Sequence, residues 1–349
     1  MTPFLKTPTQ LLGGIDTSMG AINTFLFNIL SGINSFIGNY GWSIVIFTLI
    51  IKVLLLPLDL KSRKSMRHMS DLQPQISKLQ KKYANDKEKL NQKTAELYRK
   101  EHINPLSGCL PMLLSFPILI AMFGAMRMAA NVEIANQTIQ ILVNNILPDQ
   151  GWLWVKNLWM PDSPFASIVA QEAQLKLIPV DTWISVINAL PADIMLALQG
   201  MGISVDNITT DTYQTIVSLL NSNQLYTQQL ALWSSMPEVN LILFKLQIFA
   251  SNNGFFITPV LAAVTQYLMT ITQPQTTNMN AAGGKGTGQF MKYFFPLFSL
   301  YICSTYNAGF SIYWVTSNLI AWGEGVIINE TIKLSHKKAP ALAQEDSLK

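Results

Sequence analysis

Charged residues are scarce in this chain. Only 13% of its 349 residues are Asp, Glu, Lys or Arg, whereas 49% are hydrophobic. Soluble globular proteins carry about 25% charged residues, so this composition argues against an ordinary cytosolic enzyme and against a disordered protein. The net charge of +4 is too small to indicate nucleic-acid binding by itself. A membrane protein is therefore the first hypothesis.

Cysteine and histidine are also rare. The two cysteines, Cys109 and Cys303, lie in separate apolar stretches, which excludes a disulfide framework and a CxxC-type metal site. The three histidines are scattered in polar surroundings and do not suggest zinc. No spacing typical of a catalytic nucleophile and its base occurs. We therefore expect no enzymatic reaction, no metal and no cofactor.

Apolar stretches of about 20 residues predict membrane-spanning helices. The last stretch, residues 290–328, is about twice the length that one crossing needs. Asn307-Ala308-Gly309 in its middle favours a turn, so we divide it into two helices. The five predicted spans are residues 42–60, 107–128, 255–272, 290–306 and 309–329.

The distribution of positive charge predicts the orientation of these spans. Residues 61–104, 272–289 and 329–349 hold 17 of the 24 Lys and Arg residues, whereas residues 1–41 and 129–254 hold four. Positive residues stay on the cytoplasmic side of a membrane. We therefore expect the N-terminus outside the cell and the C-terminus in the cytoplasm.

Two segments are expected to be extracytoplasmic. In the N-terminal segment, residues 1–41, no signal peptide is evident, and residues 19–37 have the apolar spacing of an amphipathic helix. That helix either lies flat in the outer interface or packs on the bundle. The second segment is the loop 129–254, in which residues 165–252 read as several short amphipathic helices.

Residues 61–104 carry 12 basic and five acidic residues. Apolar residues at steps of three and four predict two antiparallel helices that form a cytoplasmic hairpin, with Asp86 as the N-cap of the second helix. The alternative is a solvated loop that its charge keeps inside. As a hairpin, it would present a basic recruitment surface formed by Lys61, Arg63, Lys64, Arg67, Lys81, Lys82 and Arg99.

Two other segments are expected in the cytoplasm. Residues 273–289 are predicted to be a flexible Gly-rich loop, and residues 330–349 a basic tail. Lys333, Lys337 and Lys338 of the tail either contact ribosomal RNA through its phosphates or only hold the last span in orientation.

Lys52 needs an explanation, because it lies near the middle of the apolar residues 42–58. A lysine at the bilayer centre costs about 2.5–3.5 kcal/mol on insertion scales. Since no acidic residue lies near the middle of another span, we expect Lys52 to be unpaired and to require water; the alternative is local thinning of the bilayer. Thr48 lies one turn earlier on the same helix face. Polar residues of other spans are candidates for the same wet lining: Gln266, Ser311, Tyr313, Thr316, Ser317 and Asn318.

Several long stretches resemble the YidC/Oxa/Alb family of membrane protein insertases. The most specific are GWSIVIFTLIIKVLLLPLDLKSRKSM, INPLSGCLPMLLSFPILIAMF and NAGFSIYWVTSNLIAWGEGVI. The resemblance covers roughly residues 40–160 and 253–332, and it is to the shorter type common in Gram-positive bacteria; residues 165–252 look like an insert. It implies an all-α polytopic membrane protein with a five-helix core, a cytoplasmic antiparallel helical hairpin and a hydrophilic groove that is open to the cytosol and to lipid.

The resemblance also implies site residues and a function. It places the positive charge of the groove at Lys52, a groove threonine at Thr48 and an aromatic pair at Tyr313 and Trp314. It implies an insertase and chaperone in a bacterial cell membrane that functions as a monomer. The implied partners are nascent membrane proteins, the lipid bilayer, the Sec translocon, the signal recognition particle system and the ribosome.

Two other functions are alternatives to an insertase. A small-solute transporter or channel predicts paired charges within the membrane or related halves of the sequence. A membrane-anchored scaffold would use the basic hairpin to hold a partner, but it leaves Lys52 unexplained.

Overall fold

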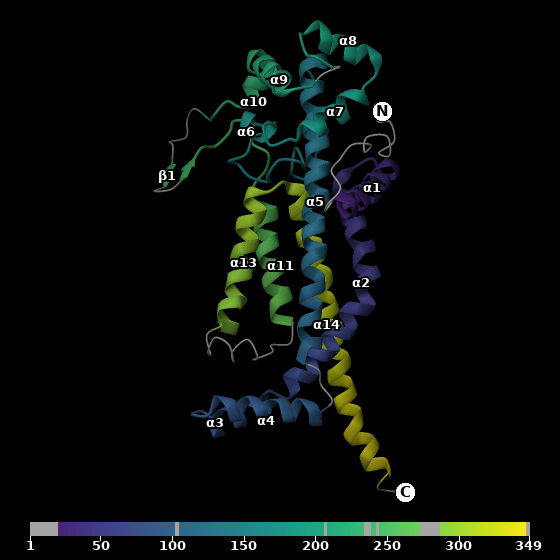
Figure 1. The fold of residues 1–349 in the computed structure, drawn as a ribbon, viewed down its shortest axis with the longest axis vertical. Helices are drawn as coiled ribbons and strands as arrows, with labels where there is room; N and C mark the ends of the chain where they lie inside the picture. Colours follow the sequence, from purple (N-terminus) through teal and green to yellow (C-terminus); the bar gives the residue numbers. More distant parts are fainter. Residues whose placement is uncertain are drawn as a thin grey trace. The chain divides into compact units, whose positions relative to one another are not determined.

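The computed structural model describes residues 20–101, 105–205, 208–233, 239–241, 244–272 and 287–346, most of them helical (Figure 1). The first 19 residues and most of the expected Gly-rich loop lie outside the described residues. The long helices are α1 (Gly20–Ile37), α2 (Tyr40–Asp71), α5 (Pro105–Asn144), α11 (Ile257–Thr272), α13 (Thr287–Thr305) and α14 (Ala308–Asp346).

The predicted spans overlap α2, α5, α11, α13 and α14. In the part of the chain that the structure describes, α1 and α2 are long and apolar enough to cross a membrane, and α11 is a shorter apolar helix. Helix α5 continues beyond the predicted span for another 16 residues, to Asn144. At 1.5 Å per residue its 40 residues extend about 60 Å, twice the thickness of the hydrocarbon core.

Apolar side chains are exposed along one face of several helices. On α11, Ile257, Val260, Leu261 and Val264 recur at steps of three and four and are all exposed. Helix α2 has the same kind of stripe, formed by Trp42, Ile46, Leu49, Ile50, Val53 and Leu54. Such extended apolar surface is rare on soluble monomers and is suited to contact with lipid.

The chain packs as two compact units. Unit 1 comprises Met1–Phe47, Leu119–Val260 and Tyr301–Tyr313, and unit 2 comprises Thr48–Ile118, Leu261–Leu300 and Trp314–Lys349. Every boundary between them falls inside a helix, so α2, α5, α11, α13 and α14 contribute residues to both units.

A buried hydrogen-bonded network connects the helices of unit 1. The Tyr40 hydroxyl donates to Glu133 Oε1 (2.8 Å) and Gln150 Nε2 donates to Glu133 Oε2 (2.6 Å). Gln137 donates to both Gln150 Oε1 and Asn157 Oδ1, at 3.2 Å each. Burial raises the pKa of the Glu133 carboxyl. These bonds join the start of α2 to α5 and to residues 150–157, and they satisfy groups that would be costly to bury alone.

Asp162 fixes the N-terminus of α11 in the same unit. Its buried carboxylate accepts hydrogen bonds from the backbone N–H groups of Phe255 (2.9 Å), Phe256 (3.2 Å) and Thr258 (2.7 Å), and from Trp154 Nε1 (2.9 Å). Backbone N–H groups at a helix start have no partner within the helix, so a carboxylate at this position is strongly stabilising.

The described residues of the insert, 165–252, form five short helices and one antiparallel pair of strands. The helices are α6 (Glu172–Leu175), α7 (Val180–Asn188), α8 (Ala192–Gly200), α9 (Thr210–Ser222) and α10 (Gln224–Gln229). An antiparallel pair, β1 (Val239–Leu241) and β2 (Phe244–Leu246), was not expected from the sequence. Backbone hydrogen bonds from Asn253 to Ala166 (2.9 Å) and from Phe249 to Pro164 (3.2 Å) hold the two ends of the insert together.

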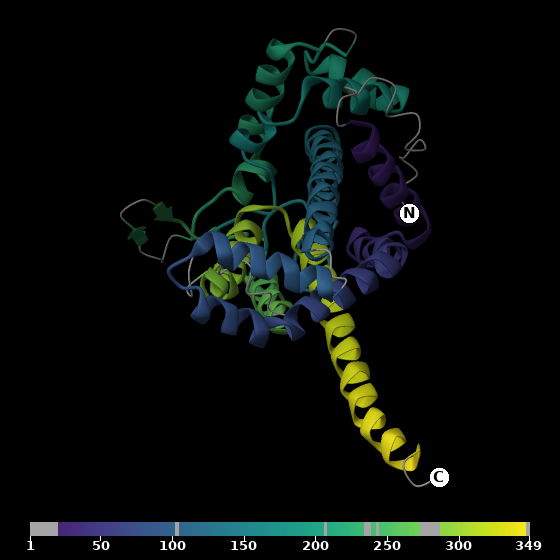
Figure 2. The same cartoon turned by 60° about the horizontal axis from the view of Figure 1, so that its bottom comes forward.

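The basic segment after α2 forms α3 (Gln73–Lys82) and α4 (Lys87–Lys100), which lie side by side (Figure 2). Ile76, Tyr98 and Leu72 form a buried apolar cluster between them. Asp86 accepts a hydrogen bond from the Lys89 N–H (2.9 Å), which confirms the predicted N-cap. The first arm was predicted as one helix but is divided at Leu72, because Pro74 has no N–H to donate to the preceding turn.

The predicted turn between the last two spans is confirmed. Helix α13 ends at Thr305, and Asn307 Oδ1 accepts a hydrogen bond from the Phe310 N–H (2.8 Å) at the start of α14. Helix α14 does not end near residue 329, where the tail was expected to begin, but continues to Asp346 (Figure 2). The side chains of the tail lysines, Lys333, Lys337 and Lys338, lie outside those that the structure describes.

The Asp162 cap generates the first prediction. Asp162→Ala leaves four donors, one of them buried and three partly buried, without their acceptor and should lower the free energy of unfolding by about 1–3 kcal/mol. Thermal unfolding of the purified protein in detergent measures this. Asp149→Asn, at an exposed position, is the matched control and should leave the transition unchanged; equal transitions for both variants would contradict the role of the cap.

Candidate functional site

Charged side chains occupy one face of α2 within unit 2. Lys52, Asp59 and Arg63 are separated by seven and four residues, and at 3.6 residues per turn all three fall within about 40° around the helix. The same face of α2 therefore presents a cation, an anion and a second cation in succession toward its C-terminal end.

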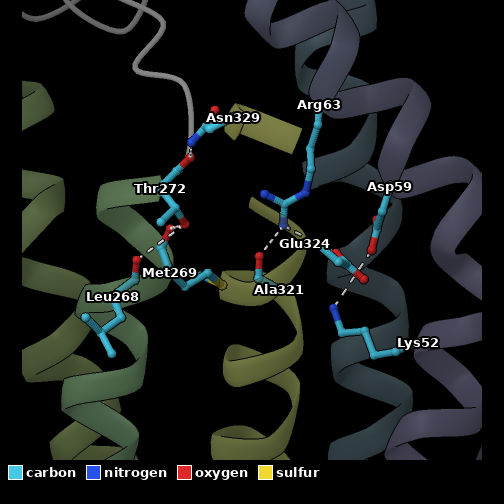
Figure 3. A network of polar contacts seen from close by, with 9 residues as sticks. All are labelled: Lys52, Asp59, Arg63, Leu268, Met269, Thr272, Ala321, Glu324 and Asn329. Atoms are coloured by element: carbon cyan, nitrogen blue, oxygen red, sulfur yellow. Dashed lines mark hydrogen bonds and ion pairs between the residues drawn. The ribbon is translucent and has the colours of Figure 1, made fainter. Parts of the chain in front are cut away.

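Lys52 is not the unpaired cation that the sequence suggests. Its Nζ atom lies 3.9 Å from Asp59 Oδ2, and both side chains are partly exposed (Figure 3). The two Cα positions are separated by about 10 Å along the helix axis. The lysine side chain therefore extends toward the predicted cytoplasmic end of α2, and its charge lies well away from the depth of its own backbone. This pair was not expected, because Asp59 lies at the end of the predicted span, 42–60, whereas Lys52 lies near its middle.

Arg63 joins α2 to α14. Its Nη2 atom donates to the backbone carbonyl of Ala321 (2.9 Å) and lies 3.5 Å from Glu324 Oε2, and both side chains are about 90% buried. The Glu324 carboxylate also interacts electrostatically with Lys52 and Asp59. The four charges, two of each sign, therefore form one locally neutral cluster (Figure 3).

A glycine brings α11 close to this cluster. A Cβ atom at Gly325 would lie 2.8 Å from Thr272 Oγ1 and 3.2 Å from Arg63 Nη1, so a larger residue would separate these groups. Asn329 Nδ2 donates to the Thr272 carbonyl (3.2 Å) and joins the end of α11 to α14. The cluster is thus held on three helices, α2, α11 and α14.

The other expected groove residues of unit 2 lie on the same helices. Asn318 on α14 is buried and contacts Thr265 Oγ1 on α11 at 3.5 Å, next to the buried Gln266. Trp314 Nε1 donates to Ser299 Oγ on α13 (3.1 Å), and Thr316 on α14 is partly buried. Helices α11, α13 and α14 are therefore linked through polar side chains, which is unusual for helices as apolar as these.

The two remaining groove residues that were expected, Thr48 and Tyr313, belong to different units. Thr48, one turn before Lys52 on α2, is fully buried. Tyr313 belongs to unit 1, where it is buried with its ring centroid 6.1 Å from that of Phe310.

The expected recruitment surface requires a correction. Arg63 was included among its cations but is buried against α14, because Glu324 and the Ala321 carbonyl compensate its charge there. Arg67 is paired with Asp71 on its own helix at 3.5 Å. The remaining members are exposed on the chain's surface: Lys61, Lys64, Lys81, Lys82 and Arg99.

Asp59 and Glu324 are the functional candidates that sequence reasoning missed. Their signal was present in the spacing, because Asp59 follows Lys52 by seven residues, a distance that returns to the same helix face. Glu324 gives no comparable signal, since its partner Arg63 is 261 residues away in the chain.

Helices with exposed apolar stripes are those of a helical membrane protein. The chain belongs to the 60Kd inner membrane protein family, whose profile matches residues 32–337. This confirms the predicted resemblance to the YidC/Oxa/Alb family.

Individual relatives match shorter regions. A protein of Fusobacterium nucleatum named membrane protein insertase YidC is 52% identical over 136 residues, which are 39% of this chain and 58% of the relative. Proteins of the same name from Cupriavidus taiwanensis and Chlorobaculum parvum are 36% and 41% identical over 44% and 39% of this chain. These matches cover only 26% and 20% of the two relatives.

The buried ion pair generates the second prediction. Arg63→Met leaves the Glu324 carboxylate without its partner and should destabilise the protein by about 3–5 kcal/mol. The double variant Arg63→Met/Glu324→Gln should recover part of that loss, and thermal unfolding of wild type, the two single variants and the double variant measures the coupling. Arg67→Met is the matched control, because its pair with Asp71 is half exposed and contributes about 0–1 kcal/mol. Additive losses in the double variant would contradict the coupling.

Proposed function

We propose that this chain is a membrane protein insertase and chaperone that inserts and helps to fold nascent membrane proteins in a bacterial cell membrane. Family membership over residues 32–337 carries the proposal. The insertase names of the relatives support it, although they are matched over only part of their length.

In the proposed topology, α2, α5, α11, α13 and α14 provide the five spans, with the N-terminus outside and the C-terminus in the cytoplasm. The exposed apolar stripes on α2 and α11 support contact with lipid. The basic helices α3 and α4 are then cytoplasmic, as the positive-inside rule requires, and the insert of residues 165–252 is extracytoplasmic.

The proposed mechanism uses the polar side chains of unit 2. A hydrophilic segment of a nascent chain must cross about 30 Å of hydrocarbon, at a high cost for each unpaired polar group. A hydrated groove at Lys52, Gln266 and Asn318 would shorten that path. The ammonium of Lys52 would attract acidic groups of the segment, and apolar helices would leave sideways into lipid. Hydrophobic partition and the membrane potential would supply the energy.

One observation bears on the transporter alternative. Paired charges were expected of a transporter, and Lys52–Asp59 and Arg63–Glu324 are such pairs. Three of the four residues, however, lie near or beyond the predicted cytoplasmic ends of their spans, where they cannot form a relay across the bilayer. Family membership therefore favours the insertase.

The proposed partners are nascent membrane proteins and the cytoplasmic machinery that delivers them, with the Sec translocon, the signal recognition particle system and the ribosome as candidates. The protein would act as a monomer. The exposed cations of α3 and α4, Lys81, Lys82 and Arg99, are the proposed contact points.

The third prediction tests the positive charge. Lys52→Ala should lower insertion of a single-span substrate with Asp or Glu in its translocated segment by about fivefold, which corresponds to ~1 kcal/mol of lost attraction. Lys52→Arg should retain insertion, because it retains the charge. The measurement is the protease-protected fraction of the substrate in reconstituted vesicles.

A substrate with Asn and Gln in place of the acidic residues serves as the control and should be inserted equally by all three proteins. Equal insertion of the acidic substrate by Lys52→Ala and wild type would contradict the role of Lys52.

The fourth prediction concerns α3 and α4. Replacing residues 73–100 with a short Gly-Ser linker should lower the rescue of growth in cells depleted of their own insertase, whereas the protein should remain in the membrane. Arg63 and Arg67 are kept, because both are paired within the chain. The control, Lys81→Gln/Lys82→Gln/Arg99→Gln, keeps the helices and removes exposed charge. Full rescue by the stably inserted deletion variant would refute a recruiting role.

A further inference from the structure

The pairing of Lys52 with Asp59 raises a question that the proposed function leaves open. A cation that attracts acidic segments would be most effective if no carboxylate of the protein were paired with it. Asp59 Oδ2, however, lies 3.9 Å from Lys52 Nζ. The Glu324 carboxylate also attracts Lys52, but it lies 3.5 Å from Arg63 Nη2, with which it forms a buried ion pair. Among the residues that the structure describes, Asp59 supplies the carboxylate that is ion-paired with Lys52, and it is therefore the one that an acidic substrate would replace.

The direction of the side chains strengthens this point. Side chains of a helix lean toward its N-terminus, so Asp59 leans toward Lys52. Lys52, in contrast, must extend toward the C-terminal end of α2 to approach Asp59 across about 10 Å of axial rise. In Figure 3 the ammonium is drawn toward the Asp59 carboxylate and lies away from its own backbone. The pair thus fixes where along α2 the positive charge is located.

Both side chains are partly exposed, at 19% for Lys52 and 29% for Asp59. In the hydrated groove of the proposed function, an incoming carboxylate can therefore reach the pair. An ion pair of this exposure contributes only about 0.2–1 kcal/mol, so a competing carboxylate can displace Asp59 and can later be displaced by it. By contrast, the Arg63–Glu324 pair is about 90% buried and is suited to a permanent structural contact.

We propose that Asp59 is a specificity-determining residue, an intramolecular competitor that limits how strongly Lys52 captures the acidic segments of substrates. This inference rests on the proposed insertase function and names the residue that sets its charge selectivity. Asp59 weakens capture of acidic segments and leaves neutral segments unaffected. It also provides for release, since Asp59 pairs again with Lys52 when the segment has passed.

The test uses the full chain reconstituted in vesicles and two short single-span substrates, one with two Glu residues and one with two Gln residues in the translocated segment. The readout is the ratio of the protease-protected fractions of the two substrates. Asp59→Asn should raise this ratio, Glu substrate over Gln substrate, about two- to fivefold, the range expected for a partly exposed ion pair. Asp59→Glu should restore the wild-type ratio.

Two control variants separate this role from others. Asp71→Asn removes the same charge from the same helix, but its carboxylate pairs with Arg67, and it should leave the ratio unchanged. In a Lys52→Gln background, Asp59→Asn should have no effect on the ratio, because there is no cation to release. A structural role of Asp59 would change the insertion of both substrates equally.

The possible failures are distinguishable. If wild type protects neither substrate above empty vesicles, the proposed function itself is wrong. If wild type inserts both but Asp59→Asn leaves the ratio unchanged or lowers it, or if its effect persists without Lys52, the insertase stands and the role of Asp59 is overturned.

Discussion

A charge within or beside a membrane must be paired or hydrated, and this requirement organises unit 2. Arg63 can be buried because Glu324 and the Ala321 carbonyl, both on α14, accept hydrogen bonds from its guanidinium group. That contact binds α2 to α14, and Gly325 lets the end of α11 approach the same point. The Lys52–Asp59 pair is more exposed than the Arg63–Glu324 pair. Helix α2 therefore takes part in a buried ion pair with α14 and carries a more exposed one within itself.

Among the described residues of unit 1, buried charged groups are stabilised by hydrogen bonds and not by ion pairs. Around Glu133 and Asp162, two buried carboxylates are held by hydrogen bonds from a tyrosine, a glutamine, a tryptophan and backbone N–H groups, in place of opposite charges. Asn253 alone donates to the carbonyls of Asn157 (2.8 Å), Met160 (3.1 Å) and Pro161 (2.9 Å). A network of this kind is directional, so it specifies one arrangement of the segments that it joins.

Much of the helical framework could be predicted from the sequence, because local chemistry determines it. The Asp86 cap, the turn at Asn307 and the helices that overlap the apolar stretches all follow from short-range patterns. The partners of charged residues could not be predicted in the same way. Arg63 looks like one more cation of a basic segment, and only the approach of α14 distinguishes it. The β1–β2 pair lacked a strong alternating pattern and was missed for that reason.

The hydrogen bonds that join the two ends of the insert have a consequence for how this chain varies. Because Ala166 and Asn253 are bonded to each other, the 86 residues between them leave the framework and return to it at a single point. A segment attached in this way can lengthen, shorten or be exchanged without moving the segments on either side. The two ends of the insert are thus held in place, and in its middle Asn223 donates to the Ile141 carbonyl of α5 (3.4 Å), so a change in its length must keep that contact.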